Sequence, residues 1–489
     1  MSVSVMIERI REAEAISRRL EPERDARAHV RDAVMAYGDD FLERLPRLKT
    51  YEISKAKAKD LRNSPICEEP AEIDELLTLF EDYVVEPGLN PASGGHVAYI
   101  PGGGIYYSSL GDYLAAVTNC YAGVRFAGPG AVEMENMLLD WMAGLVGYPE
   151  GSGGNLASGG SIANLIGIVT ARDAHGLQAR DFDRAVVYLS GQAHHCIHKA
   201  LRITGLGECV LHYVAMDERY RMIPAALEDA IAEDRAAGLI PWLVIAAAGT
   251  TDVGAIDPLE AIGGIAKANG LWYHVDAAYG GFFALVEECR PKLAGMELSD
   301  SIVLDPHKGL FLPYGTGAVL VKDKRAMQRA HHYQASYMQD ILAEEALESG
   351  SPAELSPELS RHFRGLRLWL PLKLHGVAPF RACLEEKLLL TRYFYEQVQR
   401  LGFEVGPAPE LSVATYRYVP DSGDANAFNQ ALLDEIHRDG RVFVSSTMLD
   451  GKFVLRLAVL AFRTHLETVD VTLEMLEQKV GALLRTWNA

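Results

Sequence analysis

Short apolar runs alternate with stretches of helical pattern between residues 158 and 322 of this 489-residue chain. We expect the runs to be strands, and they cover residues 185–190, 210–213, 242–247, 271–276, 302–305 and 318–321. A helix is the usual crossover between parallel strands, so this alternation predicts an α/β fold with a largely parallel sheet. The length exceeds what one hydrophobic core organises, and two or more domains are therefore expected.

Two of the predicted strands lead directly to charged side chains. Asp276 ends one run, and Lys308 lies three residues beyond another. Ligands of open parallel sheets bind beyond the carboxyl ends of the strands, so the carboxylate and the amine should meet there. Pyridoxal 5′-phosphate needs such a pair, because the amine forms a Schiff base with its aldehyde and the carboxylate keeps its ring nitrogen protonated. For an isolated Asp and Lys a structural ion pair is the better explanation, so the other motifs must decide.

A glycine- and serine-rich turn precedes a helical stretch that runs to residue 174. Glycines let the backbone approach a phosphate closely, and a helix N-terminus offers N–H groups and a positive dipole end. Gly160 and Ser161 are the predicted phosphate contacts, with Asn164 in support. A serine-capped helix after an ordinary turn is the alternative.

Further candidates follow other predicted strands. His194 can stack on one face of the pyridine ring, which leaves the opposite face to the small residue Ala278. A metal site at His194 and its histidine and cysteine neighbours is the weaker alternative, because the sequence supplies no second ligand cluster. Thr251 can bond the ring hydroxyl, with a structural threonine at a strand end as the alternative. Asp305 and His307 flank the lysine closely enough to contact the phosphate or a neighbouring subunit.

Charge and cysteine content exclude several classes of protein. The chain has 47 basic and 66 acidic residues, and a net charge of −19 disfavours nucleic acid and anionic membranes as partners. Six scattered cysteines without C-x-x-C spacing indicate reduced thiols. The N-terminus has no apolar signal core, and no stretch has the length of a membrane span. We therefore expect a cytoplasmic enzyme without a metal.

The ordered set of motifs resembles the group II pyridoxal-phosphate decarboxylases, which include the aromatic-L-amino-acid, tyrosine, tryptophan, histidine and glutamate decarboxylases. The motifs read S-G-G-S-I-A-N, Q-A-H-H, G-T-T, H-V-D-A-A-Y-G-G, D-P-H-K and S-R-H-F-R-G-L-R-L-W, and they cover the chain from about residue 96 onward. The resemblance implies the aspartate-aminotransferase-like fold (fold type I), with a mostly parallel seven-stranded sheet, and a homodimer with active sites at the subunit interface. It also implies that Lys308 is the Schiff-base lysine, Asp276 the ring-nitrogen partner, His194 the stacking imidazole and Thr251 a ring-hydroxyl contact.

Three domains are expected from the pattern and the resemblance together. Residues 1–90 form an amphipathic helical segment that packs on the partner subunit, because it cannot bury its own apolar face. Residues 91–372 form the large cofactor-binding domain. Residues 373–489 form a small α+β domain, with strand candidates at 413–418, 441–446 and 453–459.

The chain departs from the resembled family near the substrate. Many members that act on aromatic acids have Asn-Pro-His-Lys-Trp, whereas Asp305 and Gly309 flank the Pro-His-Lys core here. His96, Tyr99 and Pro101 lie where the family builds its substrate pocket, and three consecutive glycines follow them. These departures leave the identity of the amino acid open.

The resemblance implies decarboxylation of an L-amino acid, with an aromatic one favoured, to an amine and CO2 through a quinonoid intermediate. Tyr337 matches the family's loop tyrosine, which protonates Cα; phenylalanine at that position is typical of relatives that form aldehydes. The alternatives are an aldehyde synthase or other carbon–carbon lyase, an aminotransferase, and a cofactor-binding protein without turnover.

Overall fold

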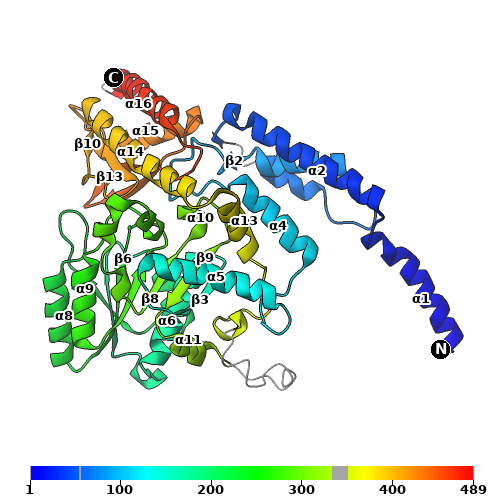
Figure 1. The fold of residues 1–489 in the computed structure, drawn as a ribbon. Coiled ribbons are helices and arrows are strands. Elements are labelled where there is room, and N and C mark those ends of the chain that lie inside the picture. Colours follow the sequence, from blue (N-terminus) through cyan, green and yellow to red (C-terminus); the bar gives the residue numbers. More distant parts are fainter. Residues whose placement is uncertain (1, 54–56, 333–350, 488–489) are drawn as a thin grey trace. The chain divides into compact units, whose positions relative to one another are not determined.

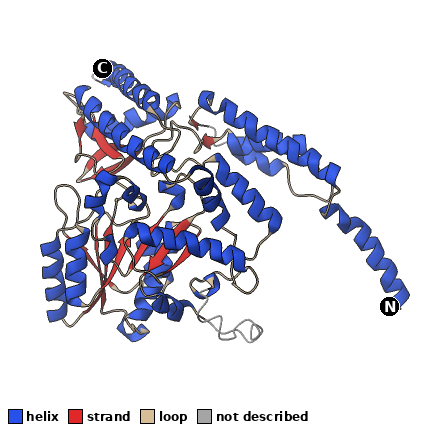
Figure 2. Cartoon of the chain, in the orientation of Figure 1, coloured by secondary structure: helices blue, strands red, loops and turns tan. Residues whose placement is uncertain are grey.

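The computed structural model describes residues 2–53, 57–332 and 351–487, and the chain divides into two compact units, Met1–Ser93 and Gly94–Ala489. Figure 1 traces the elements along the chain, and Figure 2 separates helices from strands. The described part of the first unit is mainly helical. Its main elements are α1 (Val3–Ser17), α2 (Arg24–Arg44), α3 (Ile73–Phe80) and the antiparallel pair β1 (Tyr51–Glu52) and β2 (Gly88–Leu89).

A seven-stranded sheet forms the centre of the second unit. Its strands are β3 (Gly153–Ala157), β4 (Ala185–Ser190), β5 (Val210–Val214), β6 (Ile240–Ala247), β7 (Trp272–Asp276), β8 (Ser301–Leu304) and β9 (Gly317–Val321). They lie in the order β3-β9-β8-β7-β6-β4-β5, and β9 alone in this sheet runs antiparallel to both of its neighbours. The predicted α/β fold with a mostly parallel sheet is confirmed.

Helices cover both faces of this sheet, which explains why its strands read as continuous apolar runs. In β4, Val186 and Tyr188 belong to one core, and Val187 and Leu189 belong to the other, as the alternation of side chains along a strand requires. The first core includes residues of α5 (Pro129–Val146), α8 (Pro224–Ala236) and α9 (Leu259–Asn269), and the second includes residues of α6 (Gly160–Ala174), α7 (Cys196–Ile203) and α11 (Lys324–His331). The domain is therefore a three-layer sandwich (Figure 1).

A smaller four-stranded antiparallel sheet follows in the chain. Its strands, in spatial order, are β10 (Glu404–Val405), β11 (Val413–Arg417), β13 (Lys452–Ala458) and β12 (Ser445–Leu449). The helices α14 (Ala378–Arg400), α15 (Ala425–Asp439) and α16 (Leu466–Trp487) pack with it around a separate apolar core. The remaining α-helices of the described second unit are α4 (Tyr106–Thr118), α10 (Pro306–Gly309) and α13 (Gly365–His375).

Two strand predictions differ from the structure. Residues 151–154 were expected to be a loop, yet Gly153 and Gly154 begin β3. Gly154 is closely packed there, since a Cβ would lie 2.9 Å from Leu320 Cδ2 and 3.0 Å from both Leu139 Cδ2 and the carbonyl oxygen of Val319. Residues 441–446 were expected to be a strand, but β12 begins only at Ser445, because Phe443 instead exchanges backbone hydrogen bonds with Gly95 and Val97.

In the part of the chain that the structure describes, no helix combines the length and the apolar character needed to cross a membrane.

Candidate active site

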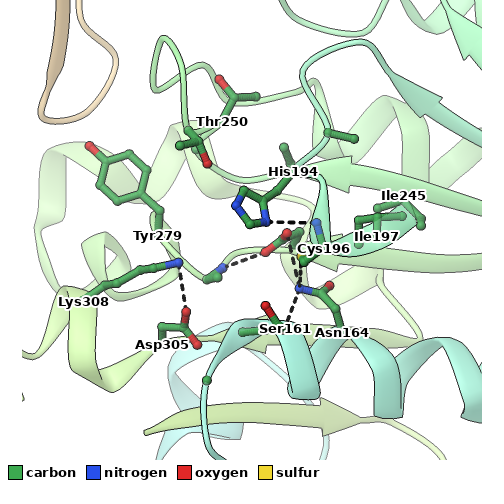
Figure 3. Close-up of a pocket in the computed structure, with 18 of the residues that line it drawn as sticks. Ser161, Asn164, His194, Cys196, Ile197, Ile245, Thr250, Tyr279, Asp305 and Lys308 are labelled. Atoms are coloured by element: carbon green, nitrogen blue, oxygen red, sulfur yellow. Dashed lines mark hydrogen bonds and ion pairs between the residues drawn. The ribbon is translucent and has the colours of Figure 1, made fainter. Parts of the chain in front are cut away.

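The carboxyl ends of β4, β6, β7 and β8 surround a cavity of about 360 Å³, a size within the range of roughly 300–1,000 Å³ usual for small-molecule sites. All ten residues predicted to bind the cofactor line this cavity. They come from five separate segments of sequence, and the sheet brings them together as expected for a parallel α/β domain. Figure 3 shows the arrangement of the side chains.

Lys308 lies on the short helix α10, which begins at Pro306 directly after β8. Its Nζ forms an ion pair with Asp305 Oδ2 at a distance of 2.9 Å (Figure 3). Burial is the largest influence on this amine and lowers its pKa, but the carboxylates of Asp305 and Asp276 outweigh it and raise the pKa overall. The pair with Asp305 therefore holds a protonated amine at the edge of the cavity.

Asp276 is the last residue of β7 and faces the same cavity. Each of its carboxylate oxygens accepts a hydrogen bond: Oδ1 from the backbone N–H of Ala278 at 3.2 Å, and Oδ2 from Asn164 Nδ2 at 3.4 Å. Two donors on opposite oxygens define the plane of the carboxylate.

His194 lines the cavity at the turn between β4 and α7. Burial is the main cause of a lowered pKa for its imidazole, although the nearby Asp276 carboxylate opposes the shift. Its Nδ1 accepts a hydrogen bond from the backbone N–H of Cys196 at 3.3 Å (Figure 3). A neutral ring held by its own backbone is suited to stacking against a flat ligand.

The N-terminus of α6 forms another wall, through Gly160 and Ser161. A Cβ at Gly160 would lie only 2.8 Å from Asp305 Oδ2 and 3.3 Å from Ala278 Cβ. Only glycine lets the helix terminus approach the lysine segment this closely. The first turn of α6 thereby directs backbone N–H groups towards the cavity, as anion sites require.

Two further predicted contacts border the cavity. Thr251 and the adjacent Thr250 both line it, and the hydroxyl of Thr250 accepts a hydrogen bond from the backbone N–H of Ala255 at 3.1 Å. His307 is buried and its Nδ1 lies 2.5 Å from the carbonyl oxygen of Thr316, so the ring is held by the backbone. Burial is also the main cause of the lowered pKa of His307.

His96, Tyr99 and Pro101 do not line the described cavity. Arg456 links this segment to the site, because its guanidinium donates to the carbonyl oxygens of both Tyr99 and Thr251. The following Gly102 packs directly on the lysine segment, where a Cβ would overlap the carbonyl oxygen of His307 at 1.8 Å. The predicted substrate pocket thus adjoins the cavity and stays a prediction.

Several cavity residues were not predicted. Cys196, Ile197 and Ile245 line it, and their apolar or thiol side chains gave no signal that separated them from core residues. Tyr279 also lines it, and its hydroxyl lies 2.8 Å from Ser412 Oγ beside β11. The predicted proton donor, Tyr337, lies outside the described residues.

The residues present fit pyridoxal phosphate. The cavity offers a lysine amine, an aspartate carboxyl group at a strand end, a neutral imidazole and a helix N-terminus cleared by glycine. These groups match the aldehyde, the ring nitrogen, the ring face and the phosphate of the cofactor. Among the described residues, no three His, Cys, Asp or Glu side chains are grouped to hold a metal ion.

Comparison with known proteins gives the same result. Residues 57–419 match the model of the pyridoxal-dependent decarboxylase conserved domain. An aromatic-L-amino-acid decarboxylase of Bacillus atrophaeus is 33% identical over 443 residues, which are 88% of this chain and 91% of that protein. A phenylacetaldehyde synthase of Arabidopsis thaliana is 30% identical and covers 85% of this chain and 87% of its own length.

A solved structure agrees with the fold. The crystal structure of Oryza sativa TDC with PLP and tryptamine has a TM-score of 0.89 and 26% sequence identity, and covers 94% of this chain and 99% of its own. These findings confirm the family resemblance, fold type I and the cofactor. The chain therefore belongs to the pyridoxal-dependent decarboxylase family, and it is a pyridoxal 5′-phosphate-dependent carboxy-lyase that acts on an amino acid.

Proposed function

We propose that this enzyme converts an aromatic L-amino acid to the corresponding amine and CO2. The observation that carries the proposal is the presence of Lys308, Asp276 and His194 around one cavity at the carboxyl edge of the sheet. When bound, pyridoxal phosphate supplies an aldehyde that binds amines and a protonated ring that accepts the electrons released with CO2.

Each residue has a separate task in this proposal. Lys308 holds the cofactor covalently, and Asp305 keeps its charged nitrogen in place at the cavity edge. Asp276 keeps a proton on the ring nitrogen, and His194 stacks on the ring so that the bond to the carboxyl group stands perpendicular to the ring plane. Gly160 and Ser161 bind the phosphate.

The aromatic preference has two supports. The relative from Bacillus atrophaeus is named for aromatic amino acids. In addition, the rings of His96 and Phe443 lie 6.4 and 6.0 Å from the ring of Tyr99, as measured between centroids. This aromatic cluster adjoins the cavity through Arg456, and flat side chains pack favourably against such rings.

A panel of the twenty amino acids tests the proposed reaction. The holoenzyme is expected to release equal amounts of amine and CO2 from at least one aromatic substrate, with other side chains turned over more slowly. Amine from a non-aromatic substrate alone would keep the reaction and overturn the substrate class. A requirement for an added 2-oxo acid would indicate an aminotransferase instead.

We propose that Tyr337 protonates the substrate carbon after CO2 leaves. Tyr337→Phe is expected to shift the product from the amine towards the aldehyde, with O2 consumed and ammonia and hydrogen peroxide formed. The relative named phenylacetaldehyde synthase supports an aldehyde as the alternative product. Parallel assays of amine, aldehyde and peroxide check it.

Tyr333→Phe provides the matched control, since it removes a hydroxyl four positions earlier in the chain. It should leave the ratio of amine to aldehyde unchanged. An unaltered product from Tyr337→Phe would assign the proton to another group.

We further propose a homodimer in which the N-terminal helices pack on the partner subunit. Helix α1 buries none of its residues, and Val3, Ile7 and Ile10 recur at helical spacing with exposed side chains. An apolar stripe of this kind needs a covering surface. Sedimentation of the wild type should give twice the chain mass of 53.6 kDa.

Ile7→Asp combined with Ile10→Asp should weaken this association, because it places charges on the apolar stripe. A double variant of polar residues on the same helix, Glu8→Gln with Arg11→Gln, serves as the control. Equal masses for the two variants at every protein concentration would argue against packing through α1.

A cytoplasmic location is also proposed. All six cysteines are free thiols, which is usual in reducing compartments. Fractionation of the source cells would check it, and recovery outside the cytoplasmic fraction would contradict it.

A further inference from the structure

A chain of buried hydrogen bonds connects Asp276, through Asn164 of the cavity wall, to residues that do not line the cavity. Trp272 Nε1 donates to Ser301 Oγ at 2.8 Å, and Ser301 Oγ lies 2.7 Å from His274 Nδ1. His274 Nε2 lies 2.8 Å from Asn164 Oδ1, and Asn164 Nδ2 donates to Asp276 Oδ2 at 3.4 Å. The side chains of His274, Ser301 and Asn164 are fully buried, so water does not compete for these bonds.

The groups at the two ends of this hydrogen-bond chain determine which atom donates and which accepts in each bond. The indole of Trp272 is only a donor, so the hydroxyl of Ser301 accepts from it and has its own proton left for His274 Nδ1. A neutral imidazole that accepts at Nδ1 carries its proton on Nε2 and donates to Asn164 Oδ1. Burial lowers the pKa of His274 to about 4, which keeps the imidazole neutral.

The other end requires the same direction. Asn164 Nδ2 lies 2.9 Å from the carbonyl oxygen of Gly160 as well as 3.4 Å from Asp276 Oδ2. If the Asn164 amide were reversed, its oxygen would face two acceptors, which is unfavourable in a buried site. The donors of Asn164 therefore point to Asp276 and Gly160, and its oxygen points to His274.

The fold makes room for this arrangement at Gly167 of α6. A Cβ there would lie 2.9 Å from His274 Cε1, so a larger residue would push the imidazole away from Asn164. The register of β7 against β8 then sets His274 directly beside Ser301. Helix and sheet thus both hold the imidazole in one position.

We propose that Asn164 and His274 are positioning residues that keep the carboxylate of Asp276 aimed at the cofactor ring nitrogen. The inference rests on the proposed role of Asp276. The donor on Oδ2 fixes the orientation of the carboxylate, and the buried hydrogen bonds back to Trp272 help to prevent Asn164 from turning its oxygen to that carboxylate. Asn164 acts through Asp276 rather than on the phosphate.

Ser301→Ala tests the chain at a point remote from the cavity. Without the hydroxyl, His274 Nδ1 has no donor opposite it, so the tautomer and position of the imidazole are no longer fixed, and the hydrogen bond from Asn164 to Asp276 Oδ2 loses its support. Ser299→Ala is a closely matched control, because Ser299 is equally buried and bonds the hydroxyl of Tyr148 at 2.7 Å, but has no place in the chain. Each variant loses two buried hydrogen bonds, because Ser299 Oγ also donates to the carbonyl oxygen of Met296 at 2.7 Å and Ser301 Oγ bonds both Trp272 and His274.

The measurement is the 15N chemical shift of ring-labelled pyridoxal phosphate bound to each holoenzyme, which reports whether the ring nitrogen carries a proton. Ser301→Ala is expected to move the shift towards the unprotonated value and to lower kcat about tenfold with KM little changed. Ser299→Ala should match the wild type.

Each result leads to a different conclusion. A protonated wild type with equal shifts in the two serine variants would overturn the positioning role and leave the proposed function intact. Failure of the wild type to bind the label, or an unprotonated ring in the wild type, would instead overturn the proposed role of Asp276.

If Ser301→Ala does not fold, His274→Gln and His274→Phe replace it. Glutamine preserves the acceptor and donor order and should retain the protonated ring, whereas phenylalanine should lose it, and equal shifts would overturn the proposal.

Discussion

Lys308→Ala is expected to abolish turnover and the visible absorbance of the bound cofactor. Among the described residues, Lys308 is the only lysine that lines the cavity. Its Nζ lies 2.9 Å from Asp305 Oδ2. Alanine leaves no nitrogen to bind the aldehyde, so kcat should fall by at least about 10³-fold, or roughly 4 kcal/mol in the activation barrier. Absorbance spectra of the purified protein, together with CO2 release, check this result.

Two further variants separate covalent binding from charge and from folding. Lys308→Arg keeps a cation beside Asp305 but cannot form the covalent link, so it should be as inactive as alanine. Lys322→Ala removes a lysine that follows β9 and lies over the ring of Tyr148. This control should keep the absorbance and most of the activity. Full activity in Lys308→Arg would refute the covalent role of Lys308.

The sheet could be predicted because both of its faces are buried. Strands β4 and β6 read as unbroken apolar runs, and their predicted limits differ from the structure by no more than two residues. The positions of Asp276 and Lys308 followed from the strand ends, since parallel strands deliver the residues that follow them to one edge. Motif order then identified the cofactor.

The hydrogen-bond chain connected to Asp276 could not be predicted in the same way. It depends on the register that sets His274 beside Ser301, and apolar runs without alternation do not reveal a register. Asn164 was expected to support the phosphate, but its described hydrogen bonds go to Asp276, His274, Gly160 and Cys196. Strand β3 escaped prediction because its glycines, which are closely packed, have low strand propensity.

Asp276→Asn is expected to lower kcat by roughly 10²–10³-fold, or about 3–4 kcal/mol, while the cofactor still binds. A neutral amide cannot keep the ring nitrogen protonated, and the electrons released with CO2 then have no effective acceptor. The 15N shift of ring-labelled pyridoxal phosphate should show loss of the proton alongside the loss of turnover.

Stability must be separated from chemistry in this variant. Both oxygens of Asp276 accept N–H donors, so whichever position the new amide nitrogen takes, two donors face each other at a cost of about 1–3 kcal/mol. Asp257→Asn has the same defect, because the oxygens of Asp257 accept from the backbone N–H groups of Met222 at 2.7 Å and Ala247 at 2.8 Å. Asp257 does not line the described cavity, so this control should lose similar stability and keep both ring protonation and turnover. Equal losses of turnover in the two variants would mean that folding, rather than charge at the ring nitrogen, explains the defect, and the proposed role of Asp276 would fail.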